Sequence, residues 1–198
     1  MEDKIKFPAN VVLMDVAFLN EVVYGAKRVL ESRLGRKLSD IDLPAWLSCL
    51  ALDAGLREEE NEVEVLLVHT PATNVLKGCE PSEVDELNSR ACRTPLGEFA
   101  FSSVTSSGLV STEALYLDLM NLALDCADVK CLMLLPFHRE YGDRVEERLA
   151  HFFKEKSEEE RGRAVYFTLE EPANPVYCRR EPVIYSLAHA FGIKPGEL

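Results

Sequence analysis

Several carboxylates in this chain of 198 residues stand beside apolar runs of sequence. Asp15 closes the run Val11–Met14, Glu140 follows a later run, and Glu113 and Asp118 belong to a helical segment between them. When carboxylates are grouped, their mutual repulsion raises the pKa of at least one of them. A hard divalent cation neutralises this charge and activates a water for attack on a phosphodiester. These residue types predict a Mg²⁺ or Mn²⁺ site with Asp15 and Glu140 as ligands and Glu113 or Asp118 as further catalytic residues.

A structural interpretation of the same carboxylates stays open. An acidic residue at the end of a strand often caps the turn or helix that follows. Glu113 and Glu140 would then lie in first helical turns, where their negative charge interacts favourably with the helix dipole.

A second set of polar residues indicates binding of an anion. Ser102 and Ser103 lie near the end of a predicted strand, and Thr112 is predicted to cap the next helix. His138 and Arg139 follow another predicted strand directly. Because helix N-termini bind anions, these five residues predict a site for RNA or a small anionic ligand such as a nucleotide.

Other chemistries lack their signatures. The sequence contains no G-x-G-x-x-G, no G-x-x-x-x-G-K-[ST] and no G-x-S-x-G, which argues against ordinary dinucleotide sites, P-loops and serine hydrolases built on His69 or His138. Its six cysteines form no C-x-x-C pair, so we expect free thiols and no zinc site.

The overall charge limits the partners. The chain has 22 Lys and Arg against 34 Asp and Glu, a net charge of -12, which would repel a phosphate backbone. Contact with RNA would therefore need a local basic patch or a bound cation. The pair Arg179-Arg180 and the acidic face that includes Glu146 are interpreted as solvated surface.

Apolar runs alternate with segments of helical periodicity. Strands are predicted over 11–14, 63–68, 98–104, 131–137 and 163–169, with 98–104 as an edge strand, and helices after Asn20, Asp42 and Thr112 and over 145–153 and 182–192. This alternation predicts an α/β fold, a three-layer sandwich with a mainly parallel sheet. We expect one domain over 1–198, with its core at about 9–170 and a helical extension over 171–198.

The carboxyl ends of parallel strands meet at one edge of the sheet, where ligands bind near the point at which strand order reverses. Asp15 and Glu140 are therefore expected to share one crevice. No apolar window is long enough for a membrane span and the N-terminus does not read as a signal peptide, so the expected location is the cytoplasm, with a homo-oligomer as an open alternative.

Three segments carry a resemblance to a known family: VVLMD, VSTEALYLDLMNLALD and LMLLPFHREYGDRVEERL. Their order resembles the NYN branch of PIN-like nucleases over roughly residues 9 to 170. In that family an aspartate closes the first strand, as Asp15 does here, and the fourth strand ends in Ser-Gly-Asp-x-Asp-Phe. His138 and Glu140 take the two aspartate positions, Tyr141 the phenylalanine position, and Thr112 or Glu113 the acidic position of the long helix.

The resemblance thus implies a PIN/NYN-like fold whose active-site motif is eroded. It favours a binding or regulatory module with little or no catalysis. A Mg²⁺- or Mn²⁺-dependent ribonuclease and a small-molecule or nucleotide-binding domain are the alternatives. The start KFPANVVL also resembles a bacterial protein family of about this length, a likeness that implies no activity.

Overall fold

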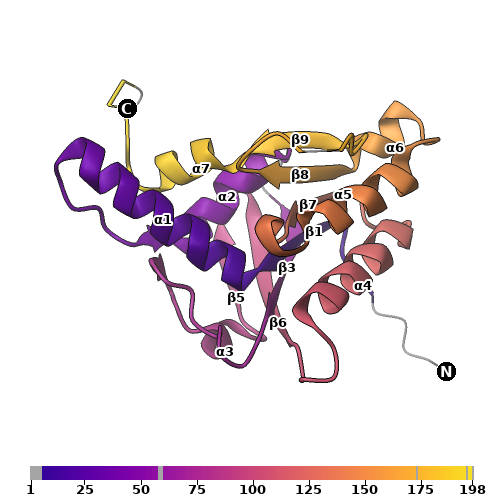
Figure 1. Cartoon of the computed structure of the whole chain (residues 1–198), viewed down its shortest axis with the longest axis horizontal. Helices are drawn as coiled ribbons and strands as arrows, with labels where there is room; N and C mark the ends of the chain where they lie inside the picture. Colours follow the sequence, from indigo (N-terminus) through magenta and orange to yellow (C-terminus); the bar gives the residue numbers. More distant parts are fainter. Residues whose placement is uncertain (1–5, 58–59, 173, 195, 198) are drawn as a thin grey trace.

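The computed structural model describes residues 6–57, 60–172, 174–194 and 196–197. Most of the chain builds one seven-stranded sheet enclosed by helices (Figure 1). The strands of this sheet are β1 (Asn10–Asp15), β3 (Asn61–His69), β5 (Ala91–Thr94), β6 (Gly97–Thr105), β7 (Cys131–Leu135), β8 (Ala164–Thr168) and β9 (Arg179–Pro182). Two short strands, β2 (Ile41–Asp42) and β4 (Cys79–Glu80), pair with each other.

The strand order is β5-β6-β3-β1-β7-β8-β9, and every neighbouring pair is parallel except β5 with β6. From β1 the chain moves outward through β3 to β6 and then returns to β7 on the other side of β1. This is the doubly wound order, whose reversal between β1 and β7 opens a crevice beyond their carboxyl ends. The predicted α/β class with a mainly parallel sheet is confirmed.

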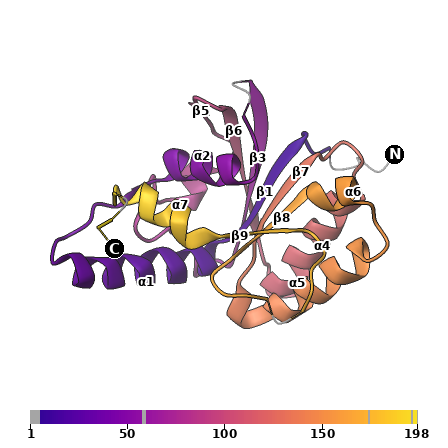
Figure 2. The ribbon, with the colours of Figure 1, turned by 90° about the horizontal axis from the view of Figure 1, so that it is seen from above.

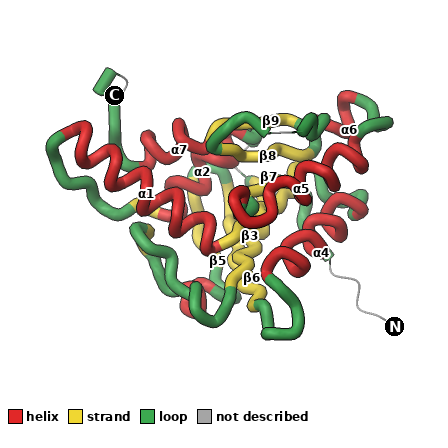
Figure 3. Tube along the Cα trace, in the orientation of Figure 1, coloured by secondary structure: helices red, strands yellow, loops and turns green. Residues whose placement is uncertain are grey.

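Helices cover both faces of the sheet (Figures 2 and 3). Their bounds are α1 (Val16–Leu34), α2 (Leu43–Asp53), α3 (Val84–Leu87), α4 (Thr112–Asp125), α5 (His138–Phe153), α6 (Glu158–Gly162) and α7 (Val183–Ala190). One core packs α1, α2 and α7 against side chains such as Val12 and Met14, and the other packs α4 and α5 against Val11 and Leu13. Because helices cover both faces of the sheet, the residues of β1 that point to either face, Val11 to Met14, are apolar.

The first helix begins earlier than the sequence indicates. Asn20 was predicted to cap it, but α1 starts at Val16, and the carboxylate of Asp15 accepts a hydrogen bond from the Phe18 backbone N–H at 3.1 Å. Asn20 lies inside the helix and instead donates to the Val75 carbonyl at 2.8 Å. Gly35 ends α1 with φ of 63°, a left-handed conformation that glycine adopts without steric cost.

Two further boundaries needed correction. Ser111, not Thr112, caps α4, because the Ser111 hydroxyl accepts from the Ala114 backbone N–H at 3.1 Å. The predicted edge strand 98–104 lies inside the sheet as β6, between β3 and the antiparallel β5. The alternating exposure of β5 made its short segment hard to distinguish from a loop.

The segment expected as a helical extension also contributes to the sheet. It supplies β9, which pairs with β8, before α7 packs against α2. Arg179, interpreted as solvated, donates from its guanidinium to the carbonyls of Asp53 and Ala54 at 2.9 and 3.0 Å and thereby satisfies the end of α2. The buried indole N–H of Trp46 donates to the Ser186 hydroxyl at 3.1 Å.

Several other expectations can be compared with the structure. All six cysteines are free, as predicted. Glu146 departs from the predicted solvated acidic face, because it is buried and accepts a hydrogen bond from the Asn174 backbone N–H at 3.1 Å. Residues 1–5 of the N-terminal stretch and residues 58 and 59 of the acidic loop lie outside the described residues. Within the described part of the chain, no helix has both the length and the apolar character that crossing a bilayer requires.

Candidate functional site

A pocket of about 340 Å³ lies beyond the carboxyl ends of β1, β3 and β7. We call it the switch-point pocket, because it lies where the strand order reverses. It brings together side chains from β1, α1, the loop after β3, α4 and α5. Its lining residues are Asp15, Ala17, Thr70, Thr73, Ser111, Thr112, Glu113, Phe137, Glu140 and Tyr141.

The centre of this pocket is a hydrogen-bonded pair of buried side chains. Asp15 is 1% exposed, and its second carboxylate oxygen accepts a hydrogen bond from the Tyr141 hydroxyl at 2.6 Å. Burial raises the pKa of Asp15, although the hydrogen bonds from Tyr141 and from the Phe18 backbone N–H act in the opposite direction. The carboxylate is therefore both the cap of α1 and a polar group facing the pocket.

A kink in α5 places Tyr141. The helix begins at His138, and at Tyr141 the backbone leaves helical geometry, with φ of -146° and ψ of 19°. The Tyr141 ring lies 5.5 Å from the ring of Tyr116, whose hydroxyl donates to the Leu13 carbonyl at 3.1 Å. Burial is the largest cause that raises the pKa of both tyrosines, so both hydroxyls remain protonated at neutral pH.

Hydroxyl groups line much of the remaining wall. The hydroxyls of Thr70 and Thr73 are 3.0 Å apart after β3, and the hydroxyl of Thr112 donates to that of Ser106 at 3.3 Å. Each hydroxyl can both donate and accept, so this wall can adapt to different polar groups of a ligand.

The predicted acidic residues are only partly brought together. Asp15, Glu113 and Glu140 line the same pocket, whereas Asp118 is exposed on α4 and does not belong to the lining. Glu113 forms an ion pair with Arg144 at 2.5 Å. Glu140 is exposed, and the described residues give it neither a hydrogen bond nor an ion pair of its side chain.

This arrangement does not fit a carboxylate-bound metal ion. Both oxygens of Asp15 already accept protein hydrogen bonds, and Glu113 is neutralised by Arg144. Over the part of the chain that the structure describes, no three His, Cys, Asp or Glu side chains are grouped so that they could hold a metal ion. We therefore derive no chemical step through Mg²⁺ or Mn²⁺.

A second pocket, of about 420 Å³, adjoins the first across Phe137, which lines both. We call it the Phe137 pocket. Its lining residues are Phe18, Glu21, Phe137, His138, Arg139, Asp143, Glu146, Leu169, Glu170 and Glu171. Two of the predicted ligand-binding residues, His138 and Arg139, thus lie here, whereas Thr112 lies in the switch-point pocket.

His138 is held between aromatic rings. Its ring centroid lies 4.7 Å from that of Phe18 and 5.3 Å from that of Tyr166. Both ring nitrogens are buried, and this burial lowers the His138 pKa to about 4, while the nearby Phe167 backbone acts in the opposite direction. Arg139 forms an ion pair with Glu21, so neither residue offers a free positive charge to an anion at neutral pH.

Ser102 and Ser103 line neither the switch-point pocket nor the Phe137 pocket. The Ser102 hydroxyl donates to the carboxylate of Glu64, and the Ser103 backbone N–H donates to the side-chain oxygen of Asn88 at 2.9 Å. Both residues therefore connect β6 to its surroundings: Ser102 to β3 and Ser103 to the segment around Asn88. Sequence reasoning missed Thr73 as a pocket residue, whereas Thr70 directly follows a predicted strand, the position at which a ligand is expected.

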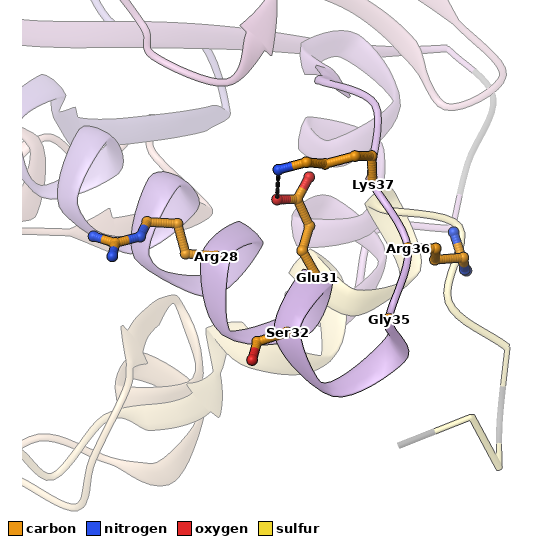
Figure 4. Close-up of a pocket in the computed structure, with 6 residues that line it drawn as sticks. All are labelled: Arg28, Glu31, Ser32, Gly35, Arg36 and Lys37. Atoms are coloured by element: carbon orange, nitrogen blue, oxygen red, sulfur yellow. Dashed lines mark hydrogen bonds and ion pairs between the residues drawn. The ribbon is translucent and has the colours of Figure 1, made fainter.

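A third pocket, of about 420 Å³, lies at the end of α1 and is basic (Figure 4). We call it the α1 pocket. Glu31 accepts hydrogen bonds from the Lys37 ammonium at 3.1 Å and from the Leu38 backbone N–H at 2.9 Å, which lower its pKa. Arg28 and Arg36 extend away from Glu31 in Figure 4. The cationic groups of the α1 pocket thus do not converge on one point.

Residues 4–198 match the model of a family described as a family of unknown function, DUF6621. Neither a curated protein nor a solved structure matches the chain.

Proposed function

We propose that this chain, which belongs to the DUF6621 family, is a binding module with a PIN/NYN-like fold and binds a small polar ligand in the switch-point pocket. The observation that carries the proposal is the Asp15–Tyr141 pair. A buried carboxylate and a buried tyrosine hydroxyl, 2.6 Å apart, face a hydroxyl-lined pocket at the place where doubly wound sheets bind ligands.

Two features support the kinship with PIN/NYN domains. The sheet has the doubly wound order, and its first strand ends in the acidic residue Asp15. Glu140, at the second acidic position of the family motif, lines the same pocket as Asp15.

The chemistry of the pocket favours binding over cleavage. The Asp15 carboxylate is already hydrogen-bonded through both oxygens, and the phenolic proton of Tyr141 is held by a raised pKa. Tyr141 therefore keeps its proton at neutral pH, and the Asp15 carboxylate is engaged by two protein donors. Both can orient a bound ligand, because their positions are fixed by α1 and by the kink of α5.

Binding can be tested with three small probes, glycerol, acetamide and ethylammonium chloride, followed by amide chemical shifts in two-dimensional NMR. We expect at least one probe to shift the amides of Thr70, Thr112 and Glu140. Ala17→Leu adds a larger side chain to the pocket wall and should abolish these shifts, whereas Ser32→Leu, on the exposed part of the same helix, should not. Absence of any shift in the wild-type pocket contradicts the proposal.

A metal-dependent ribonuclease is the second candidate, because Asp15, Glu113 and Glu140 share one pocket. Calorimetric titration with Mn²⁺ of the wild type and of Glu140→Gln separates the two. RNA cleavage that needs Mn²⁺ and disappears in Asp15→Asn would replace the binding module by the nuclease. Without such cleavage, the binding proposal stands.

A further inference from the structure

We propose that the ligand is a small organic dication, in which two ammonium groups are joined by an aliphatic chain that crosses Phe137. One ammonium would lie in the switch-point pocket and the other in the Phe137 pocket. The inference rests on the proposed function, since it names the chemical class that the switch-point pocket recognises.

The charge of the switch-point pocket selects a cation. Three carboxylates and no Lys, Arg or His belong to its lining. Arg144, from outside this lining, neutralises Glu113, and both oxygens of Asp15 accept protein hydrogen bonds, so Glu140 is the lining carboxylate that the described residues leave unpaired. An ammonium group carries three N–H donors and no acceptor, which matches the oxygens of carboxylates and hydroxyls.

The helix N-termini at this pocket do not reverse the preference. An uncapped N-terminus would attract an anion, but Asp15 caps α1 and Ser111 caps α4. Glu113 adds negative charge in the first turn of α4. The N-terminus of α5 has no side-chain cap, but Glu140 in its first turn places a carboxylate there.

The Phe137 pocket has a similar imbalance of charge. Its carboxylates Glu21 and Glu171 are paired with Arg139 and Arg180. Asp143 and Glu170 are exposed, and the described residues give their carboxylates no ion pair or hydrogen bond. A second cationic group can therefore be accommodated here without displacing an existing partner.

Phe137 connects the two pockets and provides an apolar surface between them. It lines both, is partly exposed, and already has the guanidinium of Arg139 5.8 Å from its ring centroid. The face of an aromatic ring attracts cations, and its carbon surface suits methylene groups. An aliphatic chain with an ammonium at each end matches the two acidic pockets and the apolar ring between them.

Calorimetry can compare amines that share a carbon chain: 1-aminobutane with 1,4-diaminobutane, and 1-aminohexane with 1,6-diaminohexane. We expect at least one diamine to bind about fivefold more tightly than its monoamine, because two unpaired exposed carboxylates each contribute modestly. The difference should shrink as KCl is added, since salt screens exposed charges.

The double variant Asp143→Asn/Glu170→Gln locates the second ammonium. It should reduce the affinity for the diamine to that for the monoamine and leave the monoamine unchanged. The control Asp128→Asn/Glu147→Gln removes the same charge from exposed positions that line neither pocket and should preserve the preference for the diamine.

Each outcome separates the inference from the proposed function. If glycerol or acetamide shifts the pocket amides but no diamine binds more tightly than its monoamine, the dication is wrong and the binding module stands. If the control variant lowers the preference as much as Asp143→Asn/Glu170→Gln, overall charge explains it and the second pocket is excluded. If no probe or amine binds, both proposals fail.

Discussion

The switch-point pocket and the α1 pocket have similar volumes, about 340 and 420 Å³, but they use charge differently. The first contains a carboxylate that is 1% exposed and held by a tyrosine hydroxyl. In the second, the ion pair of Arg36 with Glu197 joins side chains that are 45% and 36% exposed. Volume alone therefore does not distinguish the two pockets, whereas the burial of their polar groups does.

This difference has a physical reason. Burying a charged or polar group costs free energy unless the surrounding structure supplies its partners, so such a group must be held by several elements at once. Exposed ion pairs lose little solvation and contribute little to stability. The buried pair therefore indicates a positioned site, and the α1 pocket is explained by ordinary surface charges near a helix end.

The largest effect that would test this contrast is expected from Asp15→Ala. The variant removes the cap of α1 and leaves the Tyr141 hydroxyl without its acceptor, so we expect the free energy of unfolding to fall by about 3 kcal/mol. Asp15→Asn keeps one oxygen that can accept from the Phe18 N–H, and its NH2 group can donate to the Tyr141 hydroxyl, so it should recover part of this loss. Urea denaturation measures both variants.

Glu31→Ala in the α1 pocket is the matched control for that experiment and should change the urea midpoint far less. Equal losses at Asp15 and Glu31 would remove the distinction between the two pockets. A large loss in Asp15→Asn as well would show that the second carboxylate oxygen, which accepts from Tyr141, is needed for stability.

A smaller effect is expected from acid. The His138 pKa is lowered from 6.5 to about 4, so the unfolded chain binds the proton more tightly and stability falls as pH decreases from 6.5 toward 4. Between pH 7 and pH 5 this group should remove about 2 kcal/mol from the free energy of unfolding. His138→Gln should flatten that part of the pH profile.

His151→Gln provides the comparison, because His151 lies exposed on the same helix. We expect the fall in stability toward acid to persist in this variant, because the buried ring of His138 is intact. An identical flattening in both variants, measured by urea denaturation at each pH, would mean that the buried ring beside the Phe137 pocket does not control acid stability.

The smallest effect is expected in the α1 pocket. Arg36→Gln breaks an exposed ion pair at 3.4 Å and should cause no measurable change in melting temperature. Sulfate should stabilise the wild type and this variant equally. A stabilisation by sulfate that requires Arg36 would instead make the α1 pocket an anion site and reduce its contrast with the switch-point pocket.

The sequence contained enough information for the sheet and for part of the site. The apolar runs 11–14, 63–68 and 131–137 mark strands covered on both faces, and parallel strands bring the ends of such runs to one edge. The prediction that Asp15 and Glu140 share a crevice is confirmed by their place in one pocket. Whether they bind a metal ion is a separate question, because it depends on which protein groups already occupy their oxygens.

Contacts between residues far apart in the sequence could not be predicted from local residue spacing. Nothing near Tyr141 in the sequence shows that α5 kinks there and directs its hydroxyl to a residue 126 positions earlier. Asp15 closes a strand and caps a helix at once, so Asn20, the next residue of a capping type, falsely marks the start of the helix. The short β9 strand, with charged residues and a proline, resembled a loop.

The outermost position of β9 has a consequence for shortened versions of the protein. Removing residues 171–198 would uncover the hydrogen-bonding edge of β8, a strand whose five residues are all buried in the intact molecule. An open, apolar edge of this kind is a template for pairing with a second chain. Shortening at the C-terminus would thus favour aggregation.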